Sequence, residues 1–315
     1  MSFPVSASSS PPYALYGEQK PPFGCAAFTL IELSIVFVII GLIVGSILTG
    51  QALIQGARMS AQTAQLQQYN TAINTFRTKY NNQIPGDISA TDATAFGFAL
   101  RSGTRAQGDG NRILEGVWAG MGCGRIEGAG ETVMLWVDLS TAKMIDSNFN
   151  TASPSTSPAA DVTGAALAAY LPPARLANGN YVYAWSGGSN SNCTIPLSDA
   201  LNYFTISEVT MIQRSPTPGV VVANPGLTVA EAYALDSKTD DGYPQTGAIQ
   251  AFYVMSNVIA WAAAAGHTGQ WDTTATPGTS LTCFDNDNTG GKTQHYSMAI
   301  SGGTNLNCAL SMKFQ

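Results

Sequence analysis

The chain has 315 residues, of which 11% are charged, and its 14 basic and 20 acidic residues give a formal net charge of −6. Proteins that bind nucleic acid usually carry a basic face for the phosphates, so this balance argues against a nucleic-acid partner. Hydrophobic residues make up 45% of the chain, which suffices for a sizeable core and excludes wholesale disorder. At this length we expect one large domain or two small ones.

The first fifty residues change abruptly in character. Residues 1–24 are rich in proline and serine and have no hydrophobic period, so we predict that they are disordered. An apolar segment follows, with no charged residue from Leu33 to Leu48 and with apolar character up to Ile54. About 20 apolar residues can cross a bilayer as a helix. The segment therefore predicts a membrane-spanning helix.

Two ordinary interpretations of this segment leave features unexplained. A secretory signal has a basic start, a shorter apolar stretch and small residues after that stretch. Here the small residues, Cys25-Ala26-Ala27, come before the apolar run. A plain membrane anchor does not explain Glu32, because a carboxylate inside an apolar segment is costly unless it is paired.

The segment Phe28–Glu32, which reads FTLIE, resembles the processing signature of type IV prepilins and type II secretion pseudopilins. The resemblance implies that prepilin peptidase cuts on the cytoplasmic side between Ala27 and Phe28, removes residues 1–27 as a leader, and methylates the new amino terminus. It also implies that Glu32 pairs with the terminal amine of a neighbouring subunit and sets the register of assembly. Opposite charges attract strongly in a low dielectric, where either charge alone is penalised.

The chain departs from the family at the cleavage position. The family usually has glycine before the cut, whereas Ala27 stands there in this chain and Gly24 lies three residues upstream. A cut after Gly24 would place Glu32 at the eighth position of the mature chain instead of the fifth. We favour the cut after Ala27, because it keeps the spacing from Phe28 to Glu32.

We expect the helix to continue beyond its membrane half, residues 28–54, into an amphipathic half, residues 55–84. Apolar residues recur there at spacings of three and four, which predicts a face that packs on a globular head. The residues of this predicted face are Ala57, Ala61, Ala64, Leu66, Tyr69, Ile73, Phe76 and Tyr80. Pro85-Gly86-Asp87 is expected to end the helix.

In the membrane half, Gly41 and Gly45 have the Gly-xxx-Gly spacing. This spacing lets two helices approach closely in lipid. The alternative is that the two glycines are a chance pair in an apolar helix.

Residues 85–315 form the expected head. Runs of β-favouring residues bounded by turn residues predict strands at 180–185, 202–206, 219–222, 247–255 and 296–300. Helices are predicted at 131–145, 228–236 and 256–264, and surface loops at 101–130 and 147–164. In the first of these helices the inward residues are expected to be Val133, Leu135, Trp136, Leu139 and Met144. A long helix followed by a strand-rich head predicts an α+β fold, with an antiparallel sheet packed against the helix and large loops.

The cysteines favour disulfides over a metal site. Cys25 would be lost with the leader, which leaves Cys123, Cys193, Cys283 and Cys308. No CxxC pair and no zinc-type Cys/His spacing occurs, and single cysteines in an exported domain usually form disulfides. Four cysteines allow three connectivities, of which we favour Cys283–Cys308 with Cys123–Cys193.

Two acidic turns contain the oxygen donors that a calcium ion takes. The first has Asp236, Asp240 and Asp241 close together in the sequence. The alternative for this turn is that its carboxylates cap a helix and form hydrogen-bonded turns, with Lys238 neutralising one charge.

The second turn has donors at Asp285, Asp287 and Thr289, followed by Gly290, like the start of a calcium loop. Position 12 of such a loop is a carboxylate, but Tyr296 stands there, so the signature is incomplete. Some pseudopilins carry a structural calcium ion near the C-terminal end. The alternative is a polar loop inside the predicted Cys283–Cys308 disulfide.

The sequence gives little support for catalysis. The only histidines, His267 and His295, lie in unrelated contexts, and no hydrolase, metalloprotease, phosphate-binding or haem motif occurs. We therefore predict that the chain is not an enzyme and takes no cofactor other than a calcium ion.

The resemblance implies a structural subunit of a type IV pilus or of a type II secretion-like pseudopilus. Its partners would be prepilin peptidase, other pilin or pseudopilin subunits, the inner-membrane assembly platform and the membrane itself. The chain would reside in the bacterial inner membrane with a periplasmic head, and later in a filament. Two alternatives stay open: a monomeric binding or adhesion protein tethered by the helix, and an enzyme on a pilin-like anchor.

Overall fold

The computed structural model describes residues 29–117, 128–176, 179–188, 199–214, 219–255, 258–262, 282–286, 293–299 and 301–314. The predicted leader, the cleavage position between Ala27 and Phe28, and the predicted Cys123–Cys193 disulfide lie outside these residues. The chain divides into two compact units, Met1–Ala52 and Leu53–Gln315.

The longest element is the helix α1, Leu30–Lys79, which confirms a long N-terminal apolar helix. It ends earlier than predicted, since Asn81 and Asn82 adopt positive φ angles of 50° and 61°. Left-handed residues after a helix let its last carbonyls find partners, and asparagine tolerates that conformation. The amide of Asn82 accordingly donates to the carbonyl of Arg77 at 2.8 Å. The prediction that residues 55–84 are helical up to Pro85 was therefore wrong over its last turn.

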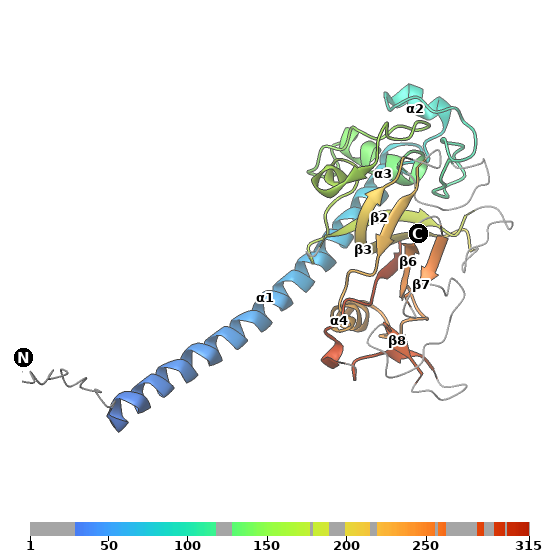
Figure 1. Ribbon diagram of the computed structural model, residues 1–315. Helices are drawn as coiled ribbons and strands as arrows, with labels where there is room; N and C mark the ends of the chain where they lie inside the picture. The colour runs from blue at the N-terminus through green and yellow to red at the C-terminus, as the bar shows by residue number, and fades with distance from the viewer. Residues whose placement is uncertain are drawn as a thin grey trace, which may run out of the picture. The chain divides into compact units, whose positions relative to one another are not determined.

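The head contains one six-stranded sheet, shown in Figure 1, in which every pairing is antiparallel. Its strands are β1 (Val162–Thr163), β2 (Asn180–Ser186), β3 (Asn202–Ile212), β4 (Val221–Asn224), β5 (Ile249–Gln250) and β10 (Leu310–Lys313). The long strand β3 is central, because β1, β2, β4 and β10 all pair with it, and β5 then pairs with β10. The head therefore has the α+β character that the sequence predicts.

Aromatic side chains join α1 to the head. Tyr69 of α1 contacts Trp136 of α3 (Glu131–Thr141) with ring centroids 4.9 Å apart, and Phe204 of β3 at 6.0 Å. All three rings are buried, so one core lies between α1, α3 and the sheet. On the sheet itself, Trp185 stacks on Tyr203 at 4.6 Å. Large buried aromatic rings dominate the energetics of such a core.

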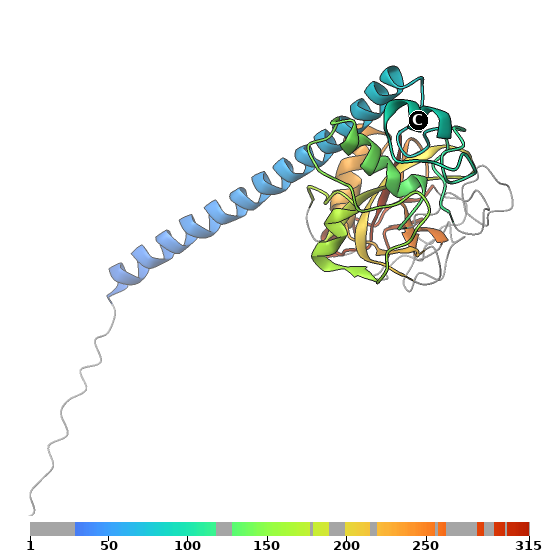
Figure 2. The same ribbon diagram turned by 90° about the horizontal axis from the view of Figure 1, so that it is seen from above.

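Short elements complete the described part of the head. The helix α2 (Ala90–Phe96) lies beside the end of α1 (Figure 2), where the rings of Tyr80 and Phe96 are 5.2 Å apart. The helix α4 (Val229–Thr239) begins with a capping box formed by Thr228 and Glu231. The remaining elements are β6 (Phe252–Met255), β7 (Val258–Trp261), β8 (Phe284–Asp285), β9 (His295–Tyr296) and the 3₁₀ turns Gly164–Ala169 and Ser301–Gly303.

Several predicted elements are confirmed with shifted ends. Strand β2 matches the prediction, β3 is longer, β4 begins at Val221 instead of residue 219, and Ala251 separates β5 from β6. Helix α3 ends at Thr141 and not at residue 145, as Lys143 adopts a positive φ of 55°. Of the residues expected to face inward from α3, only Met144 is half-buried and the others are buried.

Two predicted elements were wrong. The predicted helix at 256–264 contains strand β7 instead, which pairs with β6, and the ring centroids of Trp261 and Phe252 are 3.6 Å apart. The predicted strand at 296–300 is only the two-residue strand β9, which ends at Tyr296. In the predicted loops, residues 101–117 contain no helix or strand, while 147–164 includes β1.

The disulfide Cys283–Cys308 is present, with the two Cα atoms 4.9 Å apart and both residues fully buried. It joins the region of β8 to the segment before β10, and the backbone of Cys308 also pairs with Leu227 before α4. This predicted disulfide is confirmed.

Candidate functional site: the long helix and the acidic clusters

The first half of α1 exposes its apolar surface. From Leu33 to Ile54 its large apolar side chains are between 48% and 76% exposed. An 18-residue window of this helix has a mean hydropathy of 2.7, so the helix is long and apolar enough to cross a membrane by length and composition. Exposed apolar surface of this extent normally meets another protein or a membrane.

The serine and threonine hydroxyls in this half are bonded within the helix. Ser34 donates to the carbonyl of Ile31, Ser46 to that of Ile43, and Thr49 to that of Ser46, at 2.8–3.0 Å. Backbone and hydroxyl groups in hydrocarbon need such internal partners. Glu32 is the only charged residue between Thr29 and Ala57.

Glu32 lies in the first turn of α1 and forms a capping box with Thr29. Its Oε2 accepts from the Thr29 amide and hydroxyl, both at 2.8 Å, and the Glu32 amide donates back to the Thr29 hydroxyl at 3.3 Å. A reciprocal arrangement of Thr and Glu three residues apart fixes the start of a helix. The carboxylate therefore has a local role in capping, which the sequence also contained as a Thr-x-x-Glu pattern but which we did not predict.

The second half of α1 packs on the head with a different face from the predicted one. Ala57, Ala61 and Ala64 are exposed, so their predicted burial was wrong. The buried residues are Met59, Gln62, Gln65, Leu66, Tyr69, Ala72, Ile73, Phe76 and, just after the helix, Tyr80.

Hydrogen bonds explain why two glutamines lie on the buried face. Gln62 Oε1 accepts from the amides of Arg175 and Leu176, at 2.7 and 3.3 Å. Gln65 Nε2 donates to the carbonyl of Pro173 at 3.0 Å. Buried side-chain amides are tolerated when they have hydrogen-bond partners. The two glutamines therefore hydrogen-bond α1 to the segment that precedes β2.

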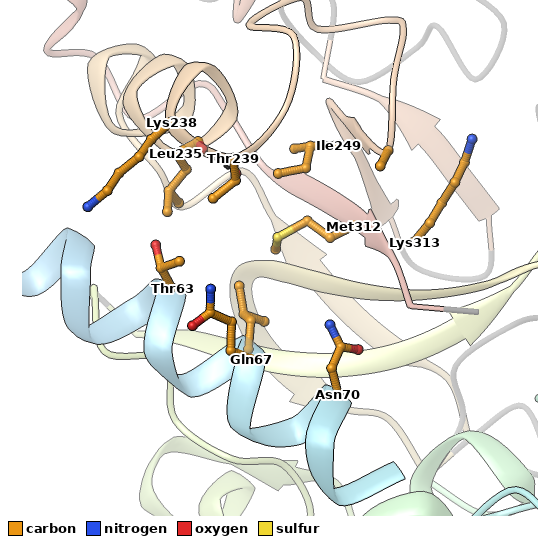
Figure 3. Close-up of a pocket in the computed structure, with 11 residues that line it drawn as sticks. Thr63, Gln67, Asn70, Leu235, Lys238, Thr239, Ile249, Met312 and Lys313 are labelled. Atoms are coloured by element: carbon orange, nitrogen blue, oxygen red, sulfur yellow. Dashed lines mark hydrogen bonds between the residues drawn. The ribbon is translucent and has the colours of Figure 1, made fainter. Parts of the chain in front are cut away.

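A groove of about 420 Å³ opens between α1, α4, β5 and β10. In Figure 3, Thr63, Gln67 and Asn70 project from α1 toward the side chains of Leu235, Ile249 and Met312 on its other wall. Two lysines stand at its edges. Lys238 Nζ contacts Ser60 Oγ at 3.4 Å, and Lys313 Nζ donates to the Gly247 carbonyl at 3.2 Å.

The first acidic turn brings its three predicted carboxylates together. One oxygen each of Asp236, Asp240 and Asp241 lies within 4.8 Å of the others. Burial raises the pKa of Asp236 to about 6, against the lowering effect of the hydrogen bonds from Tyr296 and Gly242. Converging oxygens suit a calcium ion.

Each of these carboxylates also accepts protein donors, as the turn-and-cap alternative expects. Asp236 accepts from the Tyr296 hydroxyl at 2.7 Å, Asp240 from the Ile249 amide at 2.8 Å, and Asp241 from the Thr246 hydroxyl at 2.6 Å. These bonds tie α4 to β9 and β5. The calcium ion at this turn stays a prediction.

In the second acidic turn, only Asp285 of the predicted calcium ligands lies within the described residues, and Asp287 and Thr289 lie outside them. Asp285 is buried, accepts from the Ser297 hydroxyl, and lies 3.6 Å from His295 Nε2. The Ser297 hydroxyl donates directly to the Asp285 carboxylate. In a catalytic triad the histidine lies between the serine and the aspartate and bonds both. This group does not form a catalytic triad, and the calcium prediction is untested.

A third acidic cluster was not predicted. Oxygens of Asp87, Asp109 and Glu131 lie within 4.8 Å of one another, and the fully buried Glu115 is close by. The sequence feature that could have indicated this cluster is the glycine-rich loop 101–117. Its many backbone amides need hydrogen-bond acceptors, which buried carboxylates can provide.

The buried carboxylates hold this loop in place. Asp87 accepts from the amides of Gly110 and Arg112 at 2.8 and 2.6 Å, and Glu131 from those of Gly108 and Glu115 at 2.8 and 2.9 Å. Burial raises the pKa of Asp87 to about 7, with a further increase from neighbouring carboxylates. Burial and the charge of Asp87 likewise raise the pKa of Glu131 well above its usual range.

A buried ion pair lies beside this cluster. Arg101 and Asp138 approach to 2.8 Å with both side chains 1% exposed, and Asp138 also accepts from the Gly86 amide at 2.7 Å. Burial raises the pKa of Asp138 in spite of the arginine. The pair holds the turn after α1 against α3, and breaking one partner would leave a buried charge.

Comparisons of this chain with protein-family models, with curated proteins and with solved structures find no match.

Proposed function

We propose that the chain is a structural subunit of a type IV pilus or of a type II secretion-like pseudopilus. Prepilin peptidase would process it between Ala27 and Phe28, α1 would hold it in the bacterial inner membrane, and the assembly platform would add it to a filament of similar subunits. The observation that supports this most is the exposed apolar half of α1, which carries a single carboxylate in its first turn.

The exposed half of α1 needs a partner outside the chain. Burying one large apolar side chain stabilises by about 1.5–3 kcal/mol, and more than a dozen such side chains of this half are exposed. A bilayer buries them before assembly, and the helices of neighbouring subunits bury them afterwards. Both environments are apolar, so transfer from one to the other needs no polar rearrangement along the helix except at Glu32.

Glu32 gives the assembly its register. In a low dielectric a carboxylate is stabilised by a cation of opposite charge, and the new amino terminus at Phe28 of a neighbouring subunit would supply it. Both hydrogen bonds that Thr29 donates to the Glu32 carboxylate go to Oε2. Among the described residues no donor to Oε1 occurs, so that oxygen can take the neighbour's amine while the cap is kept.

Substitutions at Glu32 and Thr29 separate the charge from the cap. Glu32→Gln removes the charge but keeps a side chain that can complete a capping box. Thr29→Ala removes the cap and keeps the charge. We expect Glu32→Gln to enter the membrane normally but to be lost from filaments, and Thr29→Ala to retain incorporation. Membrane fractions and sheared filaments, quantified by immunoblot, measure both properties.

The control is Asp146→Asn, which removes an exposed carboxylate from the head and should assemble normally. If Glu32→Gln assembles as the wild type does, the charge has no role in register. If the wild-type chain is found only as a membrane-bound monomer, the tethered binding or adhesion protein is the better function.

A further inference from the structure

The glycine-rich loop 101–117 contains a segment, residues 103–110, that is attached to the head through its backbone. Its buried residues are Ala106 and Gly108, and the others are half-buried or exposed. Burial of apolar side chains therefore contributes little to holding the segment in place. Gly108 has a φ of 79° and lies so close to the turn after α1 that a Cβ atom would be 2.2 Å from the Ile88 carbonyl oxygen.

Two buried carboxylates bond the backbone of this segment. The Gly108 amide donates to Glu131 Oε1 and the Gly110 amide to Asp87 Oδ1, each at 2.8 Å. Asp87 is 0% exposed and Glu131 is 1% exposed, and oxygens of the two lie within 4.8 Å of each other. A carboxylate oxygen has two lone pairs. Each carboxylate can therefore bind a proton without losing its amide.

The negative charge around this pair is poorly balanced. The charged residues of the elements around it are Asp92 of α2, Arg101, Arg105, Asp109, Arg112 and Glu115 of the loop, and Asp138 of α3. Glu115 is fully buried, whereas the Arg105 side chain is 43% exposed, with its Nε 3.9 Å from Glu115 Oε2. Carboxylates that share a buried site cannot all be ionised without a large penalty. The arrangement therefore favours the binding of a proton.

The pKa values agree with this geometry. Burial raises the pKa of Asp87 to about 7, and the charges of Asp109 and Glu115 add to this increase. Burial and the charge of Asp87 raise the pKa of Glu131. Opening of the segment exposes both carboxyls to water, where they lose their protons above about pH 4. Because the closed state binds more protons than the open state, a rising pH shifts the equilibrium toward the open state.

We infer that residues 103–110 form a pH-dependent clasp on the head. The clasp is closed while the Asp87–Glu131 pair holds a proton, and it opens as that proton is lost. Opening stops at Leu114, whose amide donates at 2.8 Å to the side chain of Asn202, which does not titrate. The inference concerns the head alone and does not depend on the proposed function.

Hydrogen exchange of single amides in the full chain, corrected for the intrinsic pH dependence of exchange, measures the opening. The protection of the Gly108 and Gly110 amides should fall by about tenfold or more between about pH 5.5 and pH 7. An equilibrium that releases one proton changes by up to about tenfold per pH unit. The Leu114 amide is the internal control and should keep its protection.

The double variant Asp87→Asn with Glu131→Gln removes both titrating groups but keeps an oxygen acceptor for each glycine amide. Its protection at Gly108 and Gly110 should not change with pH. Asp87→Asn alone removes one group, so the fall should be smaller than in the wild type and does not depend on whether the double variant folds. Asp146→Asn, at an exposed position, should behave as the wild type.

Three results would overturn the clasp. Protection at Gly108 and Gly110 that does not fall with pH, or that falls together with that of Leu114, would show that the segment does not open by itself. A double variant with the wild-type pH profile would show that other groups control the opening. If EDTA opens the segment at constant pH, a bound cation and not a proton closes it.

Discussion

The two halves of α1 belong to one helix but are stabilised in different ways. In the first half, from Leu33 to Ile54, large apolar side chains cover the whole circumference and all are exposed. In the second half a single face, which includes Leu66, Tyr69 and Phe76, is buried in the head. The first half has no charged residue after Glu32, which lies directly before Leu33, and the second half begins and ends near Arg58 and Arg77.

The difference shows how sequence encodes the partner of a helix. A helix that packs on one side needs an apolar face with a period of three and four residues. A helix that is apolar all round is normally buried on all sides, yet the large apolar side chains from Leu33 to Ile54 are exposed. The first half therefore depends on lipid or on other subunits, and the second half depends on its own chain.

Phe76→Ala gives the largest expected effect, because it removes a fully buried ring from the second half. Phe76 is 0% exposed and contacts the rings of Tyr80 and Phe98 at 4.5 and 5.3 Å. We expect a loss of about 3–5 kcal/mol in the free energy of unfolding, measured by urea denaturation of the full chain in detergent. The neighbouring Thr75→Ala, at an exposed position, should change it by less than about 0.5 kcal/mol. Equal effects of the two would contradict the packing described for this half.

Replacing both Cys283 and Cys308 by serine should give the next largest effect. The bridge closes a loop with a sequence separation of 25 residues, and a disulfide of this kind stabilises by about 2–4 kcal/mol. The thermal melting of the head should fall while membrane insertion through the first half of α1 is unchanged. Under reducing conditions the melting temperature of the wild-type protein should approach that of the variant. Loss of membrane insertion would show that the two halves are not independent.

The acidic cluster at Asp87 predicts a smaller effect that depends on pH. The pKa of Asp87 in the folded chain is about 7, against 3.8 for an ordinary aspartate. The folded state therefore binds more protons than the unfolded state between about pH 4 and pH 7. Stability from this group is present below that range and is lost as the pH rises through it. The slope is at most about 1.4 kcal/mol per pH unit for one carboxyl.

Urea denaturation at several pH values measures this slope. Asp87→Asn should reduce this slope, since an amide does not titrate, and the slope that remains comes from the other buried carboxyls with a raised pKa. Asp146→Asn is the control and should leave the slope unchanged. A free energy of unfolding that rises with pH between 4 and 7 in the wild type, but not in Asp87→Asn, would refute the assigned direction.

Gly45→Leu should have the smallest effect on the head. A side chain at Gly45 meets no atom within 4 Å, so the unfolding of the head should change by less than about 0.5 kcal/mol. The same substitution should weaken helix association in lipid if the Gly41–Gly45 pair is a packing motif. Normal assembly of this variant would favour the chance-pair alternative.

Local patterns in the sequence predicted much of the fold. The long apolar helix, strands β2 and β3, and most of α3 and α4 follow from periodicity and turn residues in single segments. Strand β7 was missed because the alanines after Val258 favour a helix, whereas pairing with β6 determines its conformation. The spacing of Ala61 and Ala64 is that of a packing face, which predicts that both point inward, but both are exposed. The face that is buried includes Gln62 and Gln65. Each of them hydrogen-bonds a residue more than 100 positions away in the sequence, which no local pattern could predict.

The candidate site was predictable where its chemistry lies in consecutive residues. Glu32 stands out within an apolar run, and the carboxylates near Asp236 lie within six residues. The cluster of Asp87, Asp109 and Glu131 could not be predicted in this way, because the three residues are far apart in the sequence and single carboxylates are normally solvated. Asp87 and Glu131 are buried because the fold brings the backbone amides of the loop 101–117 against them, whereas Asp109 is exposed.

The most direct test of the proposed function is to determine the N-terminal residue of the mature chain by mass spectrometry, on protein from sheared surface filaments or from membranes. We expect a chain that begins with methylated Phe28, so that Glu32 is its fifth residue. A mature chain that begins at Cys25 would keep the processing but change the register. A chain that still begins with Met1 would contradict the proposed function.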